Sequence, residues 1–238
     1  MNWQQILKAI APNGKPDIID GFAKAMPEVI KVANLTTSAR LANFLAQVAH
    51  ESDGFRTTEE YASGRAYNGR ADLGNRPGTN DGVTYKGRGL IQLTGRSNYA
   101  SMSKKLNVNF VDNPSIAAQF PYAAEIAAQY WNDKNLNAYA DIGDINAITK
   151  KINGGYNGLD DRKKYLARAM NEVSDIKMAQ RKLQELNYPP GGVDGVSGPL
   201  TRSALRDFQD AAGIRVTGVL DYDTKRTLFA DKIGRAHV

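Results

Sequence analysis

Three glutamates that lie close together in the sequence are the residues best suited to chemistry. Glu51 ends the run SARLANFLAQVAHE, in which apolar residues recur at steps of three and four, as on the buried face of an amphipathic helix. Glu59 and Glu60 follow in a polar stretch. A carboxyl on an apolar face and another among polar groups have contrasting surroundings, an arrangement typical of the acid and base that cleave glycosidic bonds. The alternative is that Glu51 faces solvent at a helix end and that Glu59 and Glu60 form a solvated pair.

The helix that carries Glu51 is expected over 38–52, with Ser38 or the threonines before it as N-cap and Gly54 at its end. Residues 89–95 alternate apolar and polar side chains, so we expect a short extended segment with Gln92 and Thr94 on one face. Apolar periodicity predicts further helices over 2–10, 17–32 (with Pro27 as a candidate kink or break), 96–106, 114–132, 144–152 and 159–172.

Residues 61–89 break this pattern. The segment is rich in glycine, lacks apolar periodicity and mixes tyrosine, asparagine and arginine. Irregular segments of this length in compact domains are usually functional or disordered, and the aromatic content argues against disorder. Tyr61 and Tyr85 are therefore candidates for contact with a sugar substrate. The alternative is an ordinary glycine-rich surface loop.

The scarcity of histidine and cysteine excludes several classes of site. The chain contains no cysteine and two histidines, His50 and His237. Disulfides and thiolate chemistry are excluded, and a zinc site would need carboxylates for most of its ligands. A zinc amidase or peptidase and a Ser-His-Asp triad are therefore disfavoured. No metal or cofactor is expected, and His50 is interpreted as a structural histidine.

Charge and hydropathy bear on the partners of the protein. The net charge of +6 is spread along the chain without a clustered basic face, so nucleic-acid binding is not expected. A modest positive balance suits an anionic polymer such as a bacterial cell wall. No apolar run is long enough for a membrane helix, and the N-terminus shows no secretory pattern. We therefore expect a protein without stable membrane association that is made and kept in a cytoplasm.

Several ordered motifs resemble glycoside hydrolase family 19, the chitinase-like family that also includes many phage endolysins. The matching runs cover most of residues 30–170 and read HESDGF, EEYASGRAYNGR, YKGRGLIQLTGRSNY, INGG and DDRKKYLARA. The resemblance implies a mainly α-helical, lysozyme-like catalytic domain over 1–172, with two lobes around a substrate cleft and an inverting mechanism. The disulfides and extra loops of the plant chitinases are missing, so the chain is more similar to the compact bacterial and phage branch.

The resemblance also implies roles for single residues. Glu51 matches the general acid and Glu60 the general base, with Glu59 as the alternative base. Thr94 matches a residue that helps to hold the attacking water. Further residues match cleft positions that bind sugar or tune the carboxylates: Gln92, Asn98, Asn153 and Arg162. In an inverting enzyme the two carboxyls stand roughly 6.5–9.5 Å apart, which leaves room for the water.

The last part of the chain contains an internal repeat. GVSGPLTRSAL (195–205) aligns with GVLDYDTKRTL (218–228), which indicates two similar turn-then-helix units. Residues 175–232 resemble the type 1 peptidoglycan-binding domain, a small three-helix bundle. The alternative is that the first turn is only a tight connection. Under the resemblance, the candidate wall-binding residues are Asp194, Gly195 and Thr201.

Together the two resemblances imply an endolysin that hydrolyses the β-1,4 glycosidic bonds of peptidoglycan as a muramidase. It is expected to act as a monomer and to wait in the host cytoplasm until a holin releases it to the wall. The alternatives are a chitinase that acts on N-acetylglucosamine polymers, a non-catalytic wall-binding structural protein of a phage, and a wall amidase or peptidase.

Overall fold

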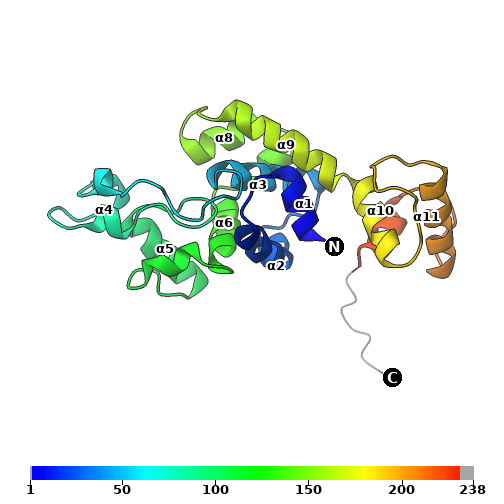
Figure 1. The fold of residues 1–238 in the computed structure, drawn as a ribbon, viewed down its shortest axis with the longest axis horizontal. Coiled ribbons are helices and arrows are strands. Elements are labelled where there is room, and N and C mark those ends of the chain that lie inside the picture. The colour runs from blue at the N-terminus through cyan, green and yellow to red at the C-terminus, as the bar shows by residue number, and fades with distance from the viewer. Residues whose placement is uncertain (1, 231–238) are drawn as a thin grey trace, which may run out of the picture. The chain divides into compact units, whose positions relative to one another are not determined.

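The chain folds into two compact helical units (Figure 1). A computed structural model describes residues 2–230, of which residues 2–170 form the first unit, while the second begins at Asn171. The described residues contain no named strand, only isolated bridges from Arg88 to Glu59 and to Leu93. The prediction of a mainly α-helical protein is confirmed. His237 and the end of the segment predicted over 175–232 lie outside the described residues.

The first unit is built from helices α1 to α8 and most of α9, whose residues 171–173 belong to the second unit. Most of these helices lie almost where the periodicity predicts them. Their bounds are α1 Trp3–Ile10, α2 Pro16–Val32, α3 Ser38–Glu51, α4 Asp81–Thr84, α5 Arg96–Leu106, α6 Tyr122–Asp133, α7 Asn137–Asp141, α8 Ile145–Asn153 and α9 Leu159–Val173. Short 3-10 turns complete them at Arg65–Tyr67, Ala71–Leu73 and Pro114–Ala118.

Two prolines behave differently from each other in the predicted helices. The helix predicted over 114–132 is interrupted before α6, at Pro121, because the residue before a proline is disfavoured in the helical conformation. The break considered at Pro27 is absent: α2 continues through this residue, which lies on the exposed face of the helix.

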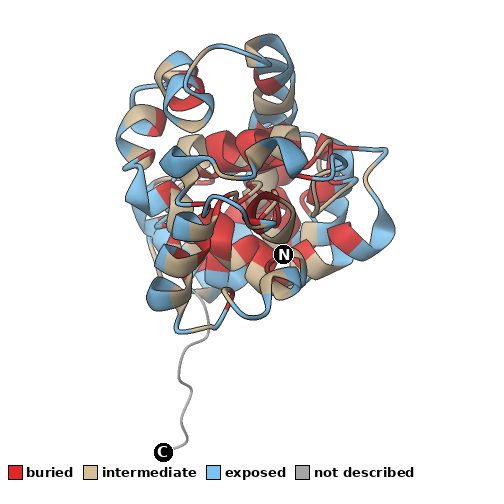
Figure 2. Ribbon diagram, turned by 90° about the vertical axis from the view of Figure 1, so that its left-hand side faces the viewer, coloured by how far each residue is buried: buried red, intermediate tan, exposed pale blue. Residues whose placement is uncertain are grey.

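Helix α3 forms the centre of the first unit. Its apolar residues Leu41, Phe44, Leu45 and Val48 are all at most 4% exposed, and Phe44 packs edge-to-face on Trp131 of α6 at 5.4 Å between ring centroids. Figure 2 shows buried residues in red along the inner faces of the helices. A helix buried on this scale delivers its last residue to a fixed place.

The segment 61–89 is irregular, as predicted, and it is ordered by polar contacts. It leaves the body formed by α1–α3 and carries α4 (Figure 1). Asp81 is 4% exposed and accepts hydrogen bonds from the backbone N–H of Arg76 at 2.9 Å and from the Arg76 Nε at 3.1 Å. The amide of Asn75, also buried, donates to the carbonyl of Tyr67 at 2.8 Å. These contacts replace the apolar periodicity that the segment lacks.

The second unit is a three-helix bundle of α10 (Asp175–Glu185), α11 (Pro199–Ala211) and α12 (Tyr222–Leu228). Its core contains Leu183, Leu205, Phe208 and Leu228. The sequence repeat corresponds to a repeated contact, in which a buried glutamine of one helix ties down the loop that follows.

Each glutamine closes its loop with both ends of its amide. In the first half, Gln180 accepts from the Gly195 N–H at 2.8 Å and donates to Asp194 Oδ1 at 2.8 Å and to Thr201 Oγ1 at 3.0 Å.

The second half repeats this arrangement. There Gln209 accepts from the Gly218 N–H at 2.8 Å and donates to the hydroxyls of Thr217 at 3.0 Å and Thr224 at 2.7 Å.

Candidate active site

A cavity of about 470 Å³ opens beside the C-terminal end of α3. The end of α3, the loop after it, Gln92 and α9 contribute its walls. Its lining residues are His50, Glu51, Asp53, Gly54, Arg56, Thr57, Glu60, Tyr61, Gln92, Asp161 and Tyr165. The structure thus brings Glu51 and Glu60 to one cavity, together with two of the predicted substrate-binding residues, Gln92 and Tyr61.

Glu51 is held by a buried guanidinium. Its side chain is 20% exposed, and its Oε1 accepts from Nη2 of Arg162 at 2.5 Å. Burial and the charge of Glu51 raise the pKa of the neighbouring Tyr130 to about 12, so this phenol stays neutral. The prediction of apolar surroundings for Glu51 is wrong at the carboxyl itself, because Arg162 forms an ion pair with it there.

A polar column continues from Glu51 into the core along α3. Gln47, one turn earlier, accepts from Nη1 of Arg162 at 2.5 Å and is completely buried. Asn43 precedes it by another turn and is 3% exposed. Polar residues at steps of four share a helix face, so the sequence contained this signal. Three buried atoms there lack a partner among the described residues: Asn43 Oδ1, Gln47 Nε2 and Arg162 Nε.

Glu60 is held from two directions on the irregular segment. Its Oε1 accepts from the hydroxyl of Tyr67 at 2.8 Å, and its Oε2 accepts from the backbone N–H of Gly87 at 3.0 Å. The hydrogen bond to Glu60, together with burial, raises the pKa of Tyr67, so Tyr67 remains a hydrogen-bond donor. The sequence prediction missed Tyr67, which lies in the segment singled out for its tyrosines.

The neighbouring Glu59 has different surroundings. It does not line the cavity, and its carboxylate lies 3.1 Å from Nε of Arg88 and 3.3 Å from Nζ of Lys86. Its side chain is thus engaged in ion pairs, whereas Glu60 faces the cavity.

Gln92 reaches the cavity through a turn, so the extended segment predicted over 89–95 is wrong. Arg88 and Leu93 exchange backbone hydrogen bonds of 3.1 and 2.7 Å around the turn, and Gln92 adopts a left-handed conformation with φ of 56°. The hydroxyl of Thr94 donates to the Gln92 carbonyl at 2.9 Å. Thr94 is not among the lining residues, and its role as holder of a water stays a prediction.

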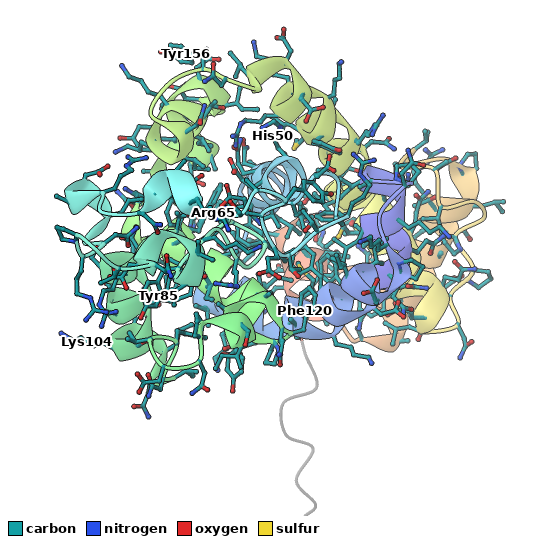
Figure 3. The ribbon with its side chains drawn as sticks, turned by 60° about the vertical axis from the view of Figure 1, so that its left-hand side comes forward. His50, Arg65, Tyr85, Lys104, Phe120 and Tyr156 are labelled. Atoms are coloured by element: carbon teal, nitrogen blue, oxygen red, sulfur yellow. The ribbon has the colours of Figure 1, made fainter. Side chains whose placement is uncertain are left out.

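Two predicted substrate contacts are corrected by burial. Tyr85 is 3% exposed, and its hydroxyl is occupied by Val111 and Arg96 at 3.1 and 2.8 Å. Figure 3 shows it well away from His50, on the side of Lys104. Arg162 is 2% exposed and contacts Glu51, so of the two roles predicted for it, binding sugar or tuning a carboxylate, its position supports the second.

Two predicted asparagines lie outside the lining of the cavity. Asn98 donates to the carbonyl of Thr94 at 2.7 Å, and Asn153 donates to the carbonyl of Asn157 at 3.3 Å. Asn98 thus ties the start of α5 to the residues before it, and Asn153 ties the end of α8 to the turn that follows. Their contact with substrate stays a prediction.

His50 lines the cavity and lies between the labelled residues Arg65 and Tyr156 in the view of Figure 3. Its Nδ1 is 2.7 Å from a carboxylate oxygen of Asp161. Gly158 packs on the imidazole so closely that an added Cβ would lie 2.3 Å from it. This packing agrees with a structural role.

Comparison with known proteins identifies the family. Residues 19–138 match the family of class I chitinases, glycoside hydrolase family 19. A glycosyl hydrolase family 19 domain-containing protein of Haemophilus influenzae is 31% identical over 177 residues, which are 62% of this chain and 86% of that protein. The chain belongs to glycoside hydrolase family 19. An endochitinase of Arabidopsis thaliana is 37% identical over 116 residues, which are 48% of this chain and 39% of the plant protein.

Solved structures agree with the family 19 fold. Chitinase C from Streptomyces griseus superposes with a TM-score of 0.59 at 22% identity, over 71% of this chain and 91% of that chain. A class IV chitinase from Zea mays gives a TM-score of 0.51 at 21% identity, over 72% and 90%. Residues 172–228 match the peptidoglycan-binding domain family. The protein is therefore a family 19 glycosidase that carries a C-terminal peptidoglycan-binding domain.

In the peptidoglycan-binding domain of this family 19 enzyme, all three predicted wall contacts form hydrogen bonds within the fold. Thr201 is 2% exposed and binds Gln180 and the Pro190 carbonyl, at 3.0 and 3.1 Å, so its hydroxyl is not available to a ligand. Asp194 accepts from Gln180, which lowers the pKa of the carboxyl. Gly195 adopts φ of 83° and donates its N–H to Gln180.

No described helix of this family 19 enzyme is long and apolar enough to cross a membrane. Within residues 2–230, no group of three His, Cys, Asp or Glu side chains is arranged to hold a metal ion.

Proposed function

We propose that this family 19 glycosidase is an endolysin that hydrolyses the β-1,4 glycan of bacterial peptidoglycan by an inverting acid–base mechanism. The observation that carries the proposal is the pair Glu51 and Glu60, which line one cavity and are held by different partners. The peptidoglycan-binding domain supports the wall as the substrate. We further propose that the protein acts as a monomer and stays in the host cytoplasm until a holin admits it to the wall.

In this mechanism Glu51 protonates the glycosidic oxygen while Glu60 accepts a proton from the attacking water. Arg162 stabilises the carboxylate that Glu51 becomes when it gives up its proton. Tyr67 and the Gly87 N–H hold Glu60 by both oxygens, so its orientation toward the water is fixed before substrate binds. Gln92 lines the same cavity, which supports a role for it in binding sugar.

The test is a digest of purified peptidoglycan, reduced with borohydride and read by mass spectrometry. New reducing ends on N-acetylmuramic acid support the muramidase. New ends on N-acetylglucosamine would keep the glycosidase and reverse the bond that is cut. Peptide release with an intact glycan would contradict the proposal. The Glu51→Gln variant, which keeps the size of the side chain, should bind walls and fail to cut them.

A second candidate is a chitinase, since the plant relatives are named endochitinases and the structural neighbours are chitinases. Rates on chitin oligosaccharides and on peptidoglycan, measured side by side, distinguish the two. A chitinase prefers the oligosaccharide, whereas the proposed enzyme prefers the wall.

A further inference from the structure

A smaller hollow of about 140 Å³ adjoins the catalytic cavity. The two cavities share four lining residues, Asp53, Gly54, Arg56 and Tyr165. The hollow is closed by residues 11–13 of the loop between α1 and α2 and by Arg168 of α9. A group attached to a sugar in the catalytic cavity can therefore extend into this hollow and contact Arg168.

The charges of the hollow do not cancel. Arg56 is neutralised by Asp53, whose Oδ1 lies 2.6 Å from Nη2, and the hydrogen bond from Arg56 lowers the pKa of Asp53, so this carboxyl is ionised near neutral pH. Arg168 donates to the uncharged carbonyl of Ile10 at 3.2 Å. In the part of the chain that the structure describes, no carboxylate forms an ion pair with Arg168.

Arg168 is also held in position. Its guanidinium carbon lies 5.8 Å from the centroid of the Tyr165 ring, and its Nη1 is fixed on Ile10. A guanidinium has five N–H donors, so donors remain for a ligand. Two anchors lower the entropy that this long side chain loses when it binds an anion. Gly54, at φ of 68°, allows the Tyr165 hydroxyl to approach its backbone closely, because an added Cβ would lie 2.7 Å from that hydroxyl.

We propose that Arg168 and the hollow beside Tyr165 bind a carboxylate of the peptide-bearing side group on the muramic acid of peptidoglycan. The inference rests on the proposed function and adds a determinant of specificity to it. Chitin carries no carboxylate, so an unmatched guanidinium at this place gains nothing from chitin. A peptidoglycan strand presents an anion on every second sugar, and a carboxylate is the group that a guanidinium binds in a bidentate manner.

The experiment compares native peptidoglycan with peptidoglycan whose carboxyls have been amidated with carbodiimide and ammonia. The measured quantity is the ratio of kcat/KM on the native to that on the amidated wall. We expect wild-type protein to prefer the native wall, and Arg168→Gln to lower this ratio by roughly three- to tenfold, the range for one partly exposed charge pair. The loss should appear in KM more than in kcat, since Arg168 does not touch the reacting atoms.

Matched variants isolate the charge. Lys163→Gln removes one positive charge from the same helix at a position outside both cavities, and should leave the ratio unchanged. Arg168→Lys keeps the charge and should retain part of the preference. Salt should lower the wild-type ratio and have less effect on Arg168→Gln.

The outcomes separate the inference from the proposed function. Wild-type protein that cuts native and amidated walls equally well, or an Arg168→Gln variant that slows both alike, would overturn the inference and leave the glycan hydrolase intact. Wild-type protein that cuts neither wall and cuts chitin would overturn the proposed function, and the inference with it. The wild-type comparison needs no mutation, so equal cleavage of the two walls would overturn the inference even if Arg168→Gln folds poorly, and Arg168→Lys, which keeps the charge, supplies the second variant.

Discussion

Arg162 on α9 contacts Glu51 at the end of α3, with 2.5 Å between Nη2 and Oε1, and the same guanidinium binds Gln47 through Nη1 at 2.5 Å. One side chain thus joins two helices and the predicted acid. Because Arg162 is 2% exposed, this connection is part of the core and not a surface ion pair. The position of Glu51 in the cavity is consequently set by the packing of α3 and α9.

Arg162→Lys tests this connection. A lysine ammonium has no planar fork, so it cannot bind Glu51 and Gln47 in the present geometry. We expect kcat to fall by roughly 10- to 100-fold and the unfolding free energy to fall by about 1–3 kcal/mol. The control is Arg40→Lys, because Arg40 makes a similar two-pronged pair with Asp141, at 2.7 and 2.6 Å, away from the cavity. It should lose some stability and keep kcat. Equal kcat in the two variants would contradict the positioning role.

Glu60→Gln and Glu59→Gln form a matched pair for the identity of the base. The first should lower kcat by roughly 10²- to 10⁴-fold, the range for loss of a general base. The second should change kcat less than about threefold, because Glu59 lies outside the cavity and is engaged with Arg88 and Lys86. The measurement is the rate of release of reducing ends from purified walls. The reverse order of the two losses would assign the base to Glu59.

Gly87→Ala should displace the predicted base without removing any charge. An added Cβ would lie 2.7 Å from Oε1 of Gln92 and 3.3 Å from Oε2 of Glu60, so Gln92 must shift and Glu60 must yield by a few tenths of an ångström. Displacement of the Glu60 carboxylate from its position is expected to lower kcat by up to roughly 100-fold. The control is Gly155→Ala, where nothing lies within 4 Å of the added atom. A Gly87→Ala enzyme with wild-type kcat would show that the orientation of Glu60 is not critical.

The peptidoglycan-binding unit should lose stability in acid. Burial alone would raise the pKa of Glu172, but hydrogen bonds from Lys177 and Arg181, at 2.7 and 2.5 Å, lower it. A carboxyl with a lowered pKa stabilises the fold above its unfolded pKa of about 4.3, and this contribution is lost as the pH falls through the folded value. Glu172→Gln should therefore lower Tm at pH 7, and its difference from wild type should shrink below about pH 4. A difference that is independent of pH would contradict the ionic origin.

A fragment of residues 171–238 should bind purified walls without the catalytic unit. It retains Glu172, which pairs with Arg181 inside the second unit. A fragment that starts at residue 175 lacks this partner and should melt at a lower temperature. The measurement is co-sedimentation with walls, after circular dichroism has shown that the fragment is helical. A folded 171–238 fragment that stays in the supernatant would contradict wall binding by this unit.

Local pattern was sufficient to predict most helices and the place of Glu51. The apolar steps that end at Glu51 define the buried face of α3, and the structure buries the same residues. Local pattern could not predict that a guanidinium lies beside Glu51, because the packing of a helix distant in sequence brings Arg162 to it. The polar steps Asn43, Gln47 and Glu51 are the one local sign that this face receives a charged partner.

The roles of the tyrosines in the irregular segment 61–89 could not be predicted for a different reason. Tyrosine has an apolar ring and a polar tip, so its type alone does not separate a core residue from a ligand contact. Tyr85 is buried on Tyr99 and Arg96, Tyr67 holds Glu60, and Tyr61 is 73% exposed. Their different roles follow from tertiary contacts of a segment without periodicity.

The paired glutamines of the second unit determine how far a substitution in one loop affects the other. Gln180 and Gln209 each close one loop through contacts within that half of the repeat. The position that accepts from the glutamine is already an aspartate in one half, Asp194, and a threonine in the other, Thr217. Because each loop is secured separately, a substitution that releases one loop leaves the hydrogen bonds of the other loop in place.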